Sequence, residues 1–176
     1  MHEYGLILGR FQPFHDGHAS IVAEAMKDCK KLIIAIGSSQ ESRTLKNPFS
    51  WQERGAIIKY SIYFSERIIV IPIPDREVKM DDSSWGEYVM ERVFEKTGVR
   101  PTIIFEGAEE ERTHWYNTLD VEIKKIDRTI NPISATKIRQ ALLENDTDTF
   151  IKNMPSKTWD FYQDMRDIIL EVYGNE

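Results

Sequence analysis

Cysteine is almost missing from this sequence. The single cysteine, Cys29, cannot form a disulfide within one chain or build a metal site from several thiolates. We expect it to be a small hydrophobe near the end of a helix. Basic residues are in the minority, since 23 lysines and arginines stand against 29 aspartates and glutamates, a formal net charge of −6. An acidic chain without a basic block argues against binding of long nucleic acid, while a local basic pocket would still suit small phosphorylated ligands.

Long apolar runs are missing as well. The longest, at residues 32–37 and 68–74, are far shorter than the roughly 18 residues that cross a membrane. Residues 1–4 lack the basic and apolar regions of a secretory signal. We therefore expect no membrane partner, and a protein that is made and kept in the cytoplasm.

Repeats, low-complexity tracts and linkers rich in proline, glycine or serine are also absent, so nothing in the sequence marks a domain boundary. A length of 176 residues corresponds to about one domain, and a content of 41% hydrophobic and 30% charged residues is ordinary for a folded chain. We predict a single domain over 1–176, with a core at 4–145 and C-terminal helices at 146–173.

The sequence does contain an alternation of short β-branched runs with helix-length segments. Strands are predicted at 4–8, 32–36, 68–73, 102–105 and 121–126, and helices between them at 17–30, 50–64, 84–97 and 108–116. Nearly continuous apolar strands are typical of a parallel sheet covered on both faces. The prediction is an α/β fold: a doubly wound, Rossmann-like parallel sheet of about five strands, with helices on both faces and a C-terminal helical segment. Its ligands would bind beyond the carboxyl ends of the strands.

Capping residues mark two helix starts. Ser50 with Glu53, and Ser84 with Glu87, have the spacing of capping boxes, in which both side chains satisfy backbone N–H groups. Further helices are predicted over 134–144 and after Pro155. The last one carries an apolar stripe that we expect to be core packing: Phe161, Met165, Ile168, Ile169 and Val172. The three carboxylates at 109–111 cannot all face one ion and are expected to be a solvated helix start.

The turn after the first predicted strand contains several residues that are common in binding and catalytic sites. It contains Gly9, Arg10, His15 and His18 directly before the first helix. A helix N-terminus offers unpaired N–H groups and a partial positive charge, and arginine and imidazole add donors for phosphate oxygens. This pattern predicts an anion site. Two other interpretations stay open: a zinc site that would need Asp16 as a further ligand, and histidines that merely cap the helix.

Two motifs in this chain resemble the signatures of one enzyme superfamily. Residues 15–18, His-Asp-Gly-His, resemble the HxGH signature of nucleotidyltransferases, and residues 133–139 resemble its second signature, I-S-x-T-x-x-R. Ser134 can cap a helix there, while Thr136 and Arg139, three residues apart, share the face that points at phosphates. Lys137 lies off that face and is expected in solvent.

Longer matches narrow the resemblance. Residues 9–18, 36–40 and 47–49, with Glu53-Arg54 after them, are similar to the archaeal-type nicotinamide mononucleotide (NMN) adenylyltransferases. Residues 127–128 and 132–139 are also similar to the adenylyltransferase domain of the NAD regulator proteins. Class I aminoacyl-tRNA synthetases carry a related histidine motif but need further domains, for which this chain has no room. The resemblance extends over residues 4 to about 143.

The resemblance implies a site and a reaction. The catalytic residues would be His15, His18, Arg139 and Arg10. ATP would contact Gly9, Phe11, Gln12, Gly17, Ser134, Thr136 and Arg139. NMN would contact Phe14, Ser38, Lys46, Asn47, Asp82 and Trp85. The NMN 5′-phosphate would attack the α-phosphorus of ATP in line, giving NAD and pyrophosphate, with Mg²⁺ carried by the ATP phosphates and no metal site on the protein. A homo-oligomer is also implied.

Some roles have alternatives. Trp85 would stack on the nicotinamide ring or pack on the sheet, and Phe14 would be pocket wall or core. Lys46 stands where the family commonly has arginine, which keeps the charge but loses the planar fork. Asp82 stands where asparagine is common, so we predict that NMN is preferred over its nicotinic acid analogue. Rival functions are a nucleotidyltransferase for phosphopantetheine, flavin mononucleotide or glycerol phosphate, and a nucleotide sensor without turnover.

Overall fold

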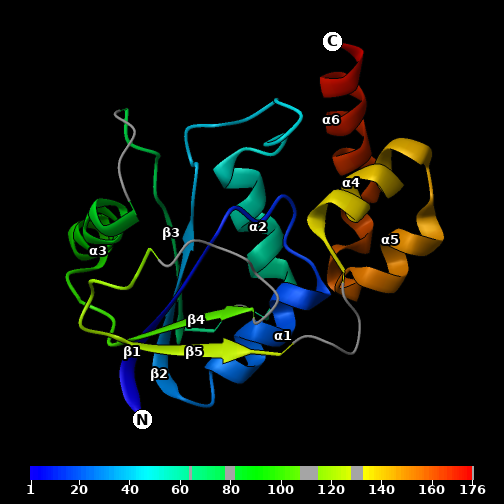
Figure 1. The fold of residues 1–176 in the computed structure, drawn as a ribbon. Coiled ribbons are helices and arrows are strands. Elements are labelled where there is room, and N and C mark those ends of the chain that lie inside the picture. Colours follow the sequence, from blue (N-terminus) through cyan, green and yellow to red (C-terminus); the bar gives the residue numbers. More distant parts are fainter. Residues whose placement is uncertain (64, 78–81, 108–114, 128–132, 176) are drawn as a thin grey trace.

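The computed structural model describes residues 1–63, 65–77, 82–107, 115–127 and 133–175. Its centre is a five-stranded parallel sheet in the order β3-β2-β1-β4-β5 (Figure 1). The strands are β1 (His2–Gly9), β2 (Cys29–Ile36), β3 (Ile68–Pro72), β4 (Ile103–Gly107) and β5 (Glu122–Ile126). The strand order reverses beside β1, and this switch point is where open α/β sheets bind ligands. The predicted fold class is confirmed.

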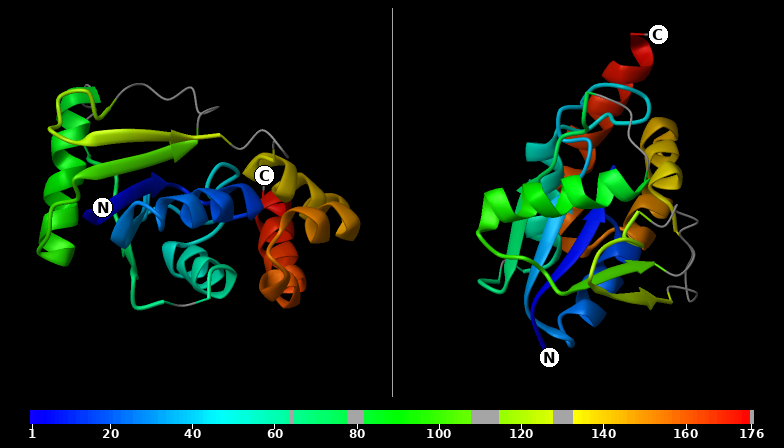
Figure 2. Two further views of the ribbon diagram at one scale, coloured as in Figure 1. Left: turned by 90° about the horizontal axis from the view of Figure 1, so that it is seen from below. Right: turned by 60° about the vertical axis from the view of Figure 1, so that its left-hand side comes forward.

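The helices lie on both faces of the sheet. They are α1 (Asp16–Ala25), α2 (Trp51–Ser61), α3 (Asp82–Thr97), α4 (Ala135–Glu144), α5 (Thr147–Asn153), the 3₁₀ helix η1 (Ser156–Phe161) and α6 (Tyr162–Gly174). Helix α3 covers one face, while α1, α2 and the C-terminal helices lie on the other (Figures 1 and 2). No described helix combines the length and the apolar character that a membrane crossing requires.

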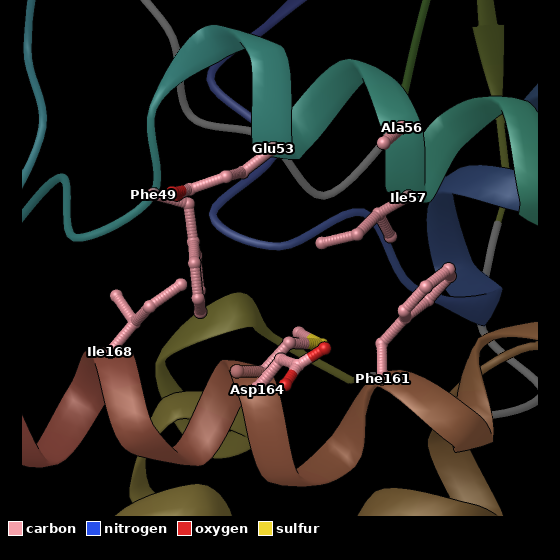
Figure 3. Close-up of a pocket in the computed structure, with 8 residues that line it drawn as sticks. Phe49, Glu53, Ala56, Ile57, Phe161, Asp164 and Ile168 are labelled. Atoms are coloured by element: carbon pink, nitrogen blue, oxygen red, sulfur yellow. The ribbon is translucent and has the colours of Figure 1, made fainter.

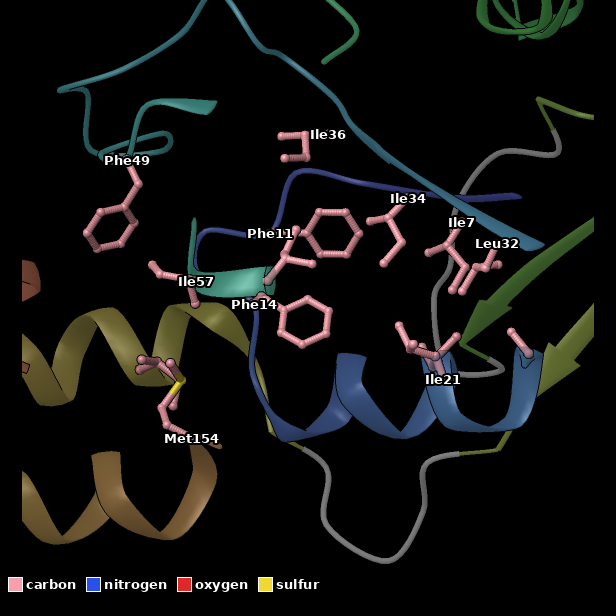
Figure 4. Packing of buried hydrophobic residues seen from close by; sticks show 14 of the residues in the cluster. Ile7, Phe11, Phe14, Ile21, Leu32, Ile34, Ile36, Phe49, Ile57 and Met154 are labelled. Carbon is pink, nitrogen blue, oxygen red and sulfur yellow. The ribbon is translucent and has the colours of Figure 1, made fainter. Parts of the chain in front are cut away.

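The alternation of side chains along β2 explains why its sequence is apolar throughout. Leu32, Ile34 and Ile36 pack into the core beneath α1 and α2 (Figure 4), whereas Ile33 and Ala35 pack into the core beneath α3. All five side chains are fully buried. A strand with helices on both faces has no solvent side, so it shows no polar alternation.

The C-terminal helices pack against α2. Met165, Ile169 and Val172 of α6 are buried, which confirms the prediction that the apolar stripe belongs to the core. A cavity of about 160 Å³ remains between α2 and α6, where Phe49 lies on the side of Ile168 and Ile57 on the side of Phe161 (Figure 3). The C-terminal segment therefore completes the core on this face.

Two predicted boundaries are wrong. Helix α1 ends at Ala25 rather than at residue 30, because Cys29 already pairs with His2 as the first residue of β2. Cys29 is fully buried, as expected, and its Sγ donates to the carbonyl of Ala25 at 3.3 Å. Helix α3 begins at Asp82, so Ser84 lies inside the helix and is not its cap. Aspartate is also favoured in a first helical turn, where its charge meets the helix dipole.

Other predicted helix starts are confirmed. At α2, the Glu53 N–H donates to Ser50 Oγ at 3.2 Å and the Ser50 N–H donates to Glu53 Oε2 at 2.9 Å, so this capping box is present. Ser134 caps α4. Of the helix predicted at 108–116, residues 108–114, including the carboxylates at 109–111, lie outside the described residues, and Trp115 and Tyr116 form a turn.

Candidate active site

The turn between β1 and α1 folds back on itself. Phe11 has a positive φ of 54°, and its ring lies where a Cβ on Gly9 would come within 2.9 Å of it. Any side chain at position 9 would displace that ring. Phe11 and Phe14 are 3% and 0% exposed and belong to the hydrophobic core (Figure 4). Of the two interpretations of Phe14, the structure favours core packing.

His15 and His18 cap α1 together. The Gly17 N–H donates to His15 Nδ1 at 3.0 Å, the His15 N–H donates to His18 Nδ1 at 3.3 Å, and the two rings stack with centroids 3.9 Å apart. Capping is therefore a real role of this pair. Because Nδ1 accepts in both rings, the proton of each neutral imidazole is on Nε2, which makes Nε2–H a hydrogen-bond donor. His15 is 2% exposed and His18 is more accessible.

Two core phenylalanines, Phe11 and Phe14, contact the ring of His18. The Phe11 ring meets it edge-on at 4.9 Å between centroids, and the Phe14 ring lies nearly parallel to it at 5.5 Å. Among the described residues, no group of three or more histidines, cysteines, aspartates or glutamates stands close enough to hold a metal ion. The described neighbours of His18 thus include aromatic rings and helix-capping groups.

Arg139 joins α4 to this turn. Its Nη1 donates to the Gln12 carbonyl at 2.8 Å and its Nη2 to Thr136 Oγ1 at 3.3 Å, so Thr136 and Arg139 do share a helix face. Burial, together with the charge of Arg10, lowers the pKa of Arg139. The Ser134 hydroxyl accepts the Lys137 N–H as a cap, while the Lys137 side chain is exposed, as predicted.

Gln12 links the turn to the segment before α2. Its buried amide donates to the Phe49 carbonyl at 3.0 Å and accepts the Phe49 N–H at 2.9 Å. Asn47 is also buried and accepts from Arg10 Nη1 at 3.4 Å. The structure thus gives Gln12 and Asn47 supporting contacts, with Asn47 orienting Arg10.

A cleft of about 270 Å³ opens at the carboxyl ends of β1 and β2. Its lining contains the predicted site residues Gly9, Arg10, Ser38, Lys46 and Trp85, and three others, Leu8, Gly37 and Asp75. Trp85 also packs against Tyr88, with ring centroids 5.2 Å apart. One face of Trp85 therefore supports the core while the residue lines the cleft. The Asp82 side chain lies outside the described residues.

Sequence reasoning missed Asp75 as a site residue. Its Oδ2 accepts from Gln40 Nε2 at 3.0 Å, and its N–H donates to Gln40 Oε1 at 2.9 Å. Gln40 ends one of the segments that carried the family resemblance, so its amide was the available signal. Arg54 was also missed, although the pair Glu53-Arg54 is part of the family resemblance. It is fully buried beside the cleft.

The chain is similar to known proteins in sequence. A family model described as cytidylyltransferase-like matches residues 6–141. The nicotinamide-nucleotide adenylyltransferase of Saccharolobus solfataricus is 42% identical over 89 residues, which cover 48% of this chain and 50% of that protein. That of Thermococcus kodakarensis is 32% identical over 150 residues, which cover 81% of this chain and 73% of that protein.

A solved structure has the same fold. The bifunctional NMN adenylyltransferase/ADP ribose pyrophosphatase of Francisella tularensis superposes with a TM-score of 0.80 at 22% identity, over 99% of this chain and 54% of that chain. The chain thus spans about half the length of the S. solfataricus relative and of the F. tularensis chain that it matches. Because the family model matches most of the sequence, the chain belongs to the cytidylyltransferase-like family.

Proposed function

We propose that this protein is a nicotinamide-nucleotide adenylyltransferase, which forms NAD and pyrophosphate from ATP and NMN. The observation that carries the proposal is the arrangement of His15, His18 and Arg139 at the N-terminus of α1, next to a cleft that contains Arg10 and Trp85. Relatives of that name at 32% to 42% identity support it.

The chemistry needs positioning and charge neutralisation. An oxygen of the NMN 5′-phosphate forms a bond to the α-phosphorus of ATP, the bond from that phosphorus to the bridging oxygen breaks, and pyrophosphate leaves with the electron pair. The attacking phosphate is already an anion near neutral pH, so the reaction needs no protein nucleophile. Groups that donate hydrogen bonds where charge develops are what the site has to supply.

On the ATP side, we assign the main role to His18. Its Nε2–H would donate to the α-phosphate, and Arg139 would neutralise the phosphate chain from α4. His15 is more buried and would fix the ring of His18 by stacking. Gly17, Ser134 and Thr136 would complete the N-terminal rim, where backbone N–H groups of two helices favour anions.

On the acceptor side, Lys46 and Arg10 line the same cleft as Trp85. The two cations would bind the mononucleotide phosphate, with Asn47 orienting Arg10, and Trp85 would stack on the nicotinamide ring. Ser38 would contact the same nucleotide, and Asp82 would accept from its carboxamide.

The proposal includes a divalent cation. A structure of the F. tularensis relative contains AMP and a manganese ion. We propose that Mg²⁺ enters with ATP, because it prefers phosphate and water oxygens as ligands. The cytoplasm is the proposed compartment, since the reaction consumes ATP. A homo-oligomer is the proposed assembly, and light scattering after size-exclusion chromatography would measure it.

The test is product formation from ATP and Mg²⁺ with NMN as acceptor. Parallel reactions would contain nicotinic acid mononucleotide, flavin mononucleotide, phosphopantetheine or glycerol phosphate, and both pyrophosphate and the dinucleotide would be measured. We expect NAD with stoichiometric pyrophosphate. Reaction with another acceptor alone would transfer the assignment to that acceptor, and tight ATP binding without pyrophosphate release would favour a sensor.

A further inference from the structure

Arg54 is a fully buried arginine beside the cleft at the carboxyl ends of β1 and β2. We call this cleft, where the mononucleotide would bind, the acceptor cleft. The guanidinium of Arg54 donates to five main-chain carbonyls: Arg10 at 2.9 Å, Gly37 at 2.8 Å, Ser38 at 3.1 Å, Ser50 at 3.2 Å and Glu41 at 3.5 Å. A guanidinium has five N–H groups, so each can be matched to one acceptor. Three of these carbonyls belong to residues that line the cleft.

These bonds fix the direction of two peptide groups. A trans peptide holds its C=O and N–H on opposite sides. Because the carbonyls of Arg10 and Gly37 point at Arg54, the N–H groups of Phe11 and Ser38 point away from it. Within the described part of the chain, neither amide has a hydrogen-bond acceptor.

The environment of the Arg54 charge is also unusual for a buried cation. Burial, and then the nearby charge of Arg10, lower its pKa to about 10, so it stays protonated at neutral pH. Glu53 and Asp75 act on it from a distance, but among the described residues no carboxylate forms a salt bridge with it. A buried cation held only by carbonyl dipoles is costly, and an anion in the adjacent cleft would compensate it.

We propose that Arg54 is a positioning residue of the acceptor cleft. Its guanidinium turns the peptide groups at the ends of β1 and β2, so that the amides of Phe11 and Ser38 face the cleft as phosphate donors. Its fixed charge adds to that of Arg10 and Lys46. This role rests on the proposed function for the identity of the substrate, but the binding of a phosphate by these amides does not require turnover.

The variant that tests the proposal is Arg54→Lys, which keeps the charge but has three donors for five carbonyls. Its matched control is Arg67→Lys. Arg67 donates to the carbonyls of Met26, Cys29 and Lys30, each at 2.9 Å, at the amino end of β2, far along the strand from the cleft. Both variants remove arginine–carbonyl bonds, and only one of the two sets lies at the site.

We expect Arg54→Lys to raise the KM for NMN about tenfold or more and to lower kcat, because misplaced donors lose both binding and transition-state contacts. Arg67→Lys should lower the thermal midpoint but leave KM and kcat near the wild-type values. Equal kinetic effects of the two variants, measured well below their melting temperatures, would overturn the proposal.

A second measurement uses the wild-type protein and so does not depend on whether a variant folds. Amide resonances of Phe11 and Ser38 would be followed by ¹⁵N NMR during titration with NMN, with ATP, and with nicotinamide riboside, which lacks the phosphate. We expect the two phosphorylated ligands to shift these amides and the riboside to leave them unchanged. Identical responses to NMN and the riboside would refute the role of the amides. If they respond to phosphate but no NAD forms, the proposed function fails and this inference stands.

Discussion

At the scale of single residues, a histidine can serve the fold and the chemistry at once because its two nitrogens are separate groups. In His15 and His18, Nδ1 accepts a backbone N–H at the start of α1, and this bond determines that the neutral ring has its proton on Nε2. The helix cap and a phosphate donor are thus compatible interpretations of one motif.

His18→Gln separates these two roles. Glutamine at the third helical position can still accept the N–H of the capping residue, whereas it has no imidazole to donate at the position of Nε2. We expect kcat to fall on the order of 10²-fold or more, as for other lost oxyanion donors, with the thermal midpoint nearly unchanged. His18→Ala should lose similar activity and also about 1 kcal/mol of stability from the missing cap. A folded His18→Gln enzyme with full kcat would refute the assignment.

Asp82 leads to a prediction about specificity that comes from the sequence. A carboxylate accepts from the amide of NMN but repels the carboxylate of nicotinic acid mononucleotide. We expect kcat/KM to be higher for NMN, and Asp82→Asn to narrow the difference. Steady-state kinetics with both acceptors would measure the ratio, and equal values for the wild-type enzyme would contradict this role.

At the scale of elements, α3 depends on a glycine where it meets the turn that begins at Trp115. A Cβ on Gly86 would lie 2.3 Å from the Trp115 carbonyl oxygen, so Gly86→Ala must move the start of α3. We expect a loss of about 1 to 3 kcal/mol in the free energy of unfolding and a higher KM for NMN, because Trp85 moves with the helix.

Gly55 of α2 provides the matched control for this change. A Cβ there would lie 3.7 Å from Ile36 Cδ1, an ordinary contact. Gly55→Ala should therefore be neutral or stabilise α2 by about 0.5 to 1 kcal/mol. Urea unfolding of both variants measures the difference, and equal losses of stability would show that the contact with Trp115 is not the cause.

The start of α2 contains a pH-dependent contribution to stability. Although burial alone would raise the pKa of Glu53, its bonds with Arg43 and the Ser50 N–H outweigh burial and hold that pKa below the ordinary value of 4.5. A carboxyl with a lowered pKa stabilises the fold above the unfolded value and loses that contribution as the pH falls through the folded value.

Glu53→Gln tests that contribution, because glutamine can still cap the helix but has no charge for Arg43. We expect the variant to be about 1 kcal/mol less stable than wild type at neutral pH, since the ion pair is partly exposed. The difference should shrink as the pH falls below 4.5 through the lowered pKa of folded Glu53, and vanish once that carboxyl is protonated in both states. A difference that is constant with pH would mean that packing, not charge, is responsible.

Elements were predictable where the local sequence determines them. The apolar strand runs and the Ser50 capping box need no distant information, and the structure confirms them. The end of α1 was not predictable, because Cys29 becomes part of a strand only through its pairing with His2. The carbonyl acceptors of Arg54 were not predictable either, since most of them come from segments far from it in the sequence. The roles of the site residues stay predictions.

At the scale of the whole molecule, the side chains that we propose to bind phosphate come from distant parts of the sequence. The histidines lie at the start of α1, whereas Arg139 lies in α4, much later in the sequence. A ligand that bridges them should stabilise the entire fold. With ATP at about 100 times its Kd, the expected gain is about 2.7 kcal/mol, or roughly 5 to 10 °C in Tm.

Thermal unfolding with ATP and with adenosine measures this effect of the phosphates. We expect ATP to raise the Tm strongly, adenosine to raise it little, and Arg139→Met to lose most of the ATP effect. Arg67→Lys serves as the control, because we expect it to lower the Tm of the protein without ligand and to leave the proposed phosphate-binding side chains in place. Equal stabilisation by adenosine and ATP would mean that contacts with the nucleoside, and not with the phosphates, stabilise the fold.

The bond from Arg139 to the Gln12 carbonyl has a consequence for biosynthesis. It joins positions 127 residues apart, so a ribosome has to synthesise all the residues between them before the bond can form. Contacts this distant form late in folding, because a long loop must close first. A nascent or prematurely terminated chain would carry the histidines without their arginine, and the site that we propose for ATP would be complete only after Arg139 had been synthesised.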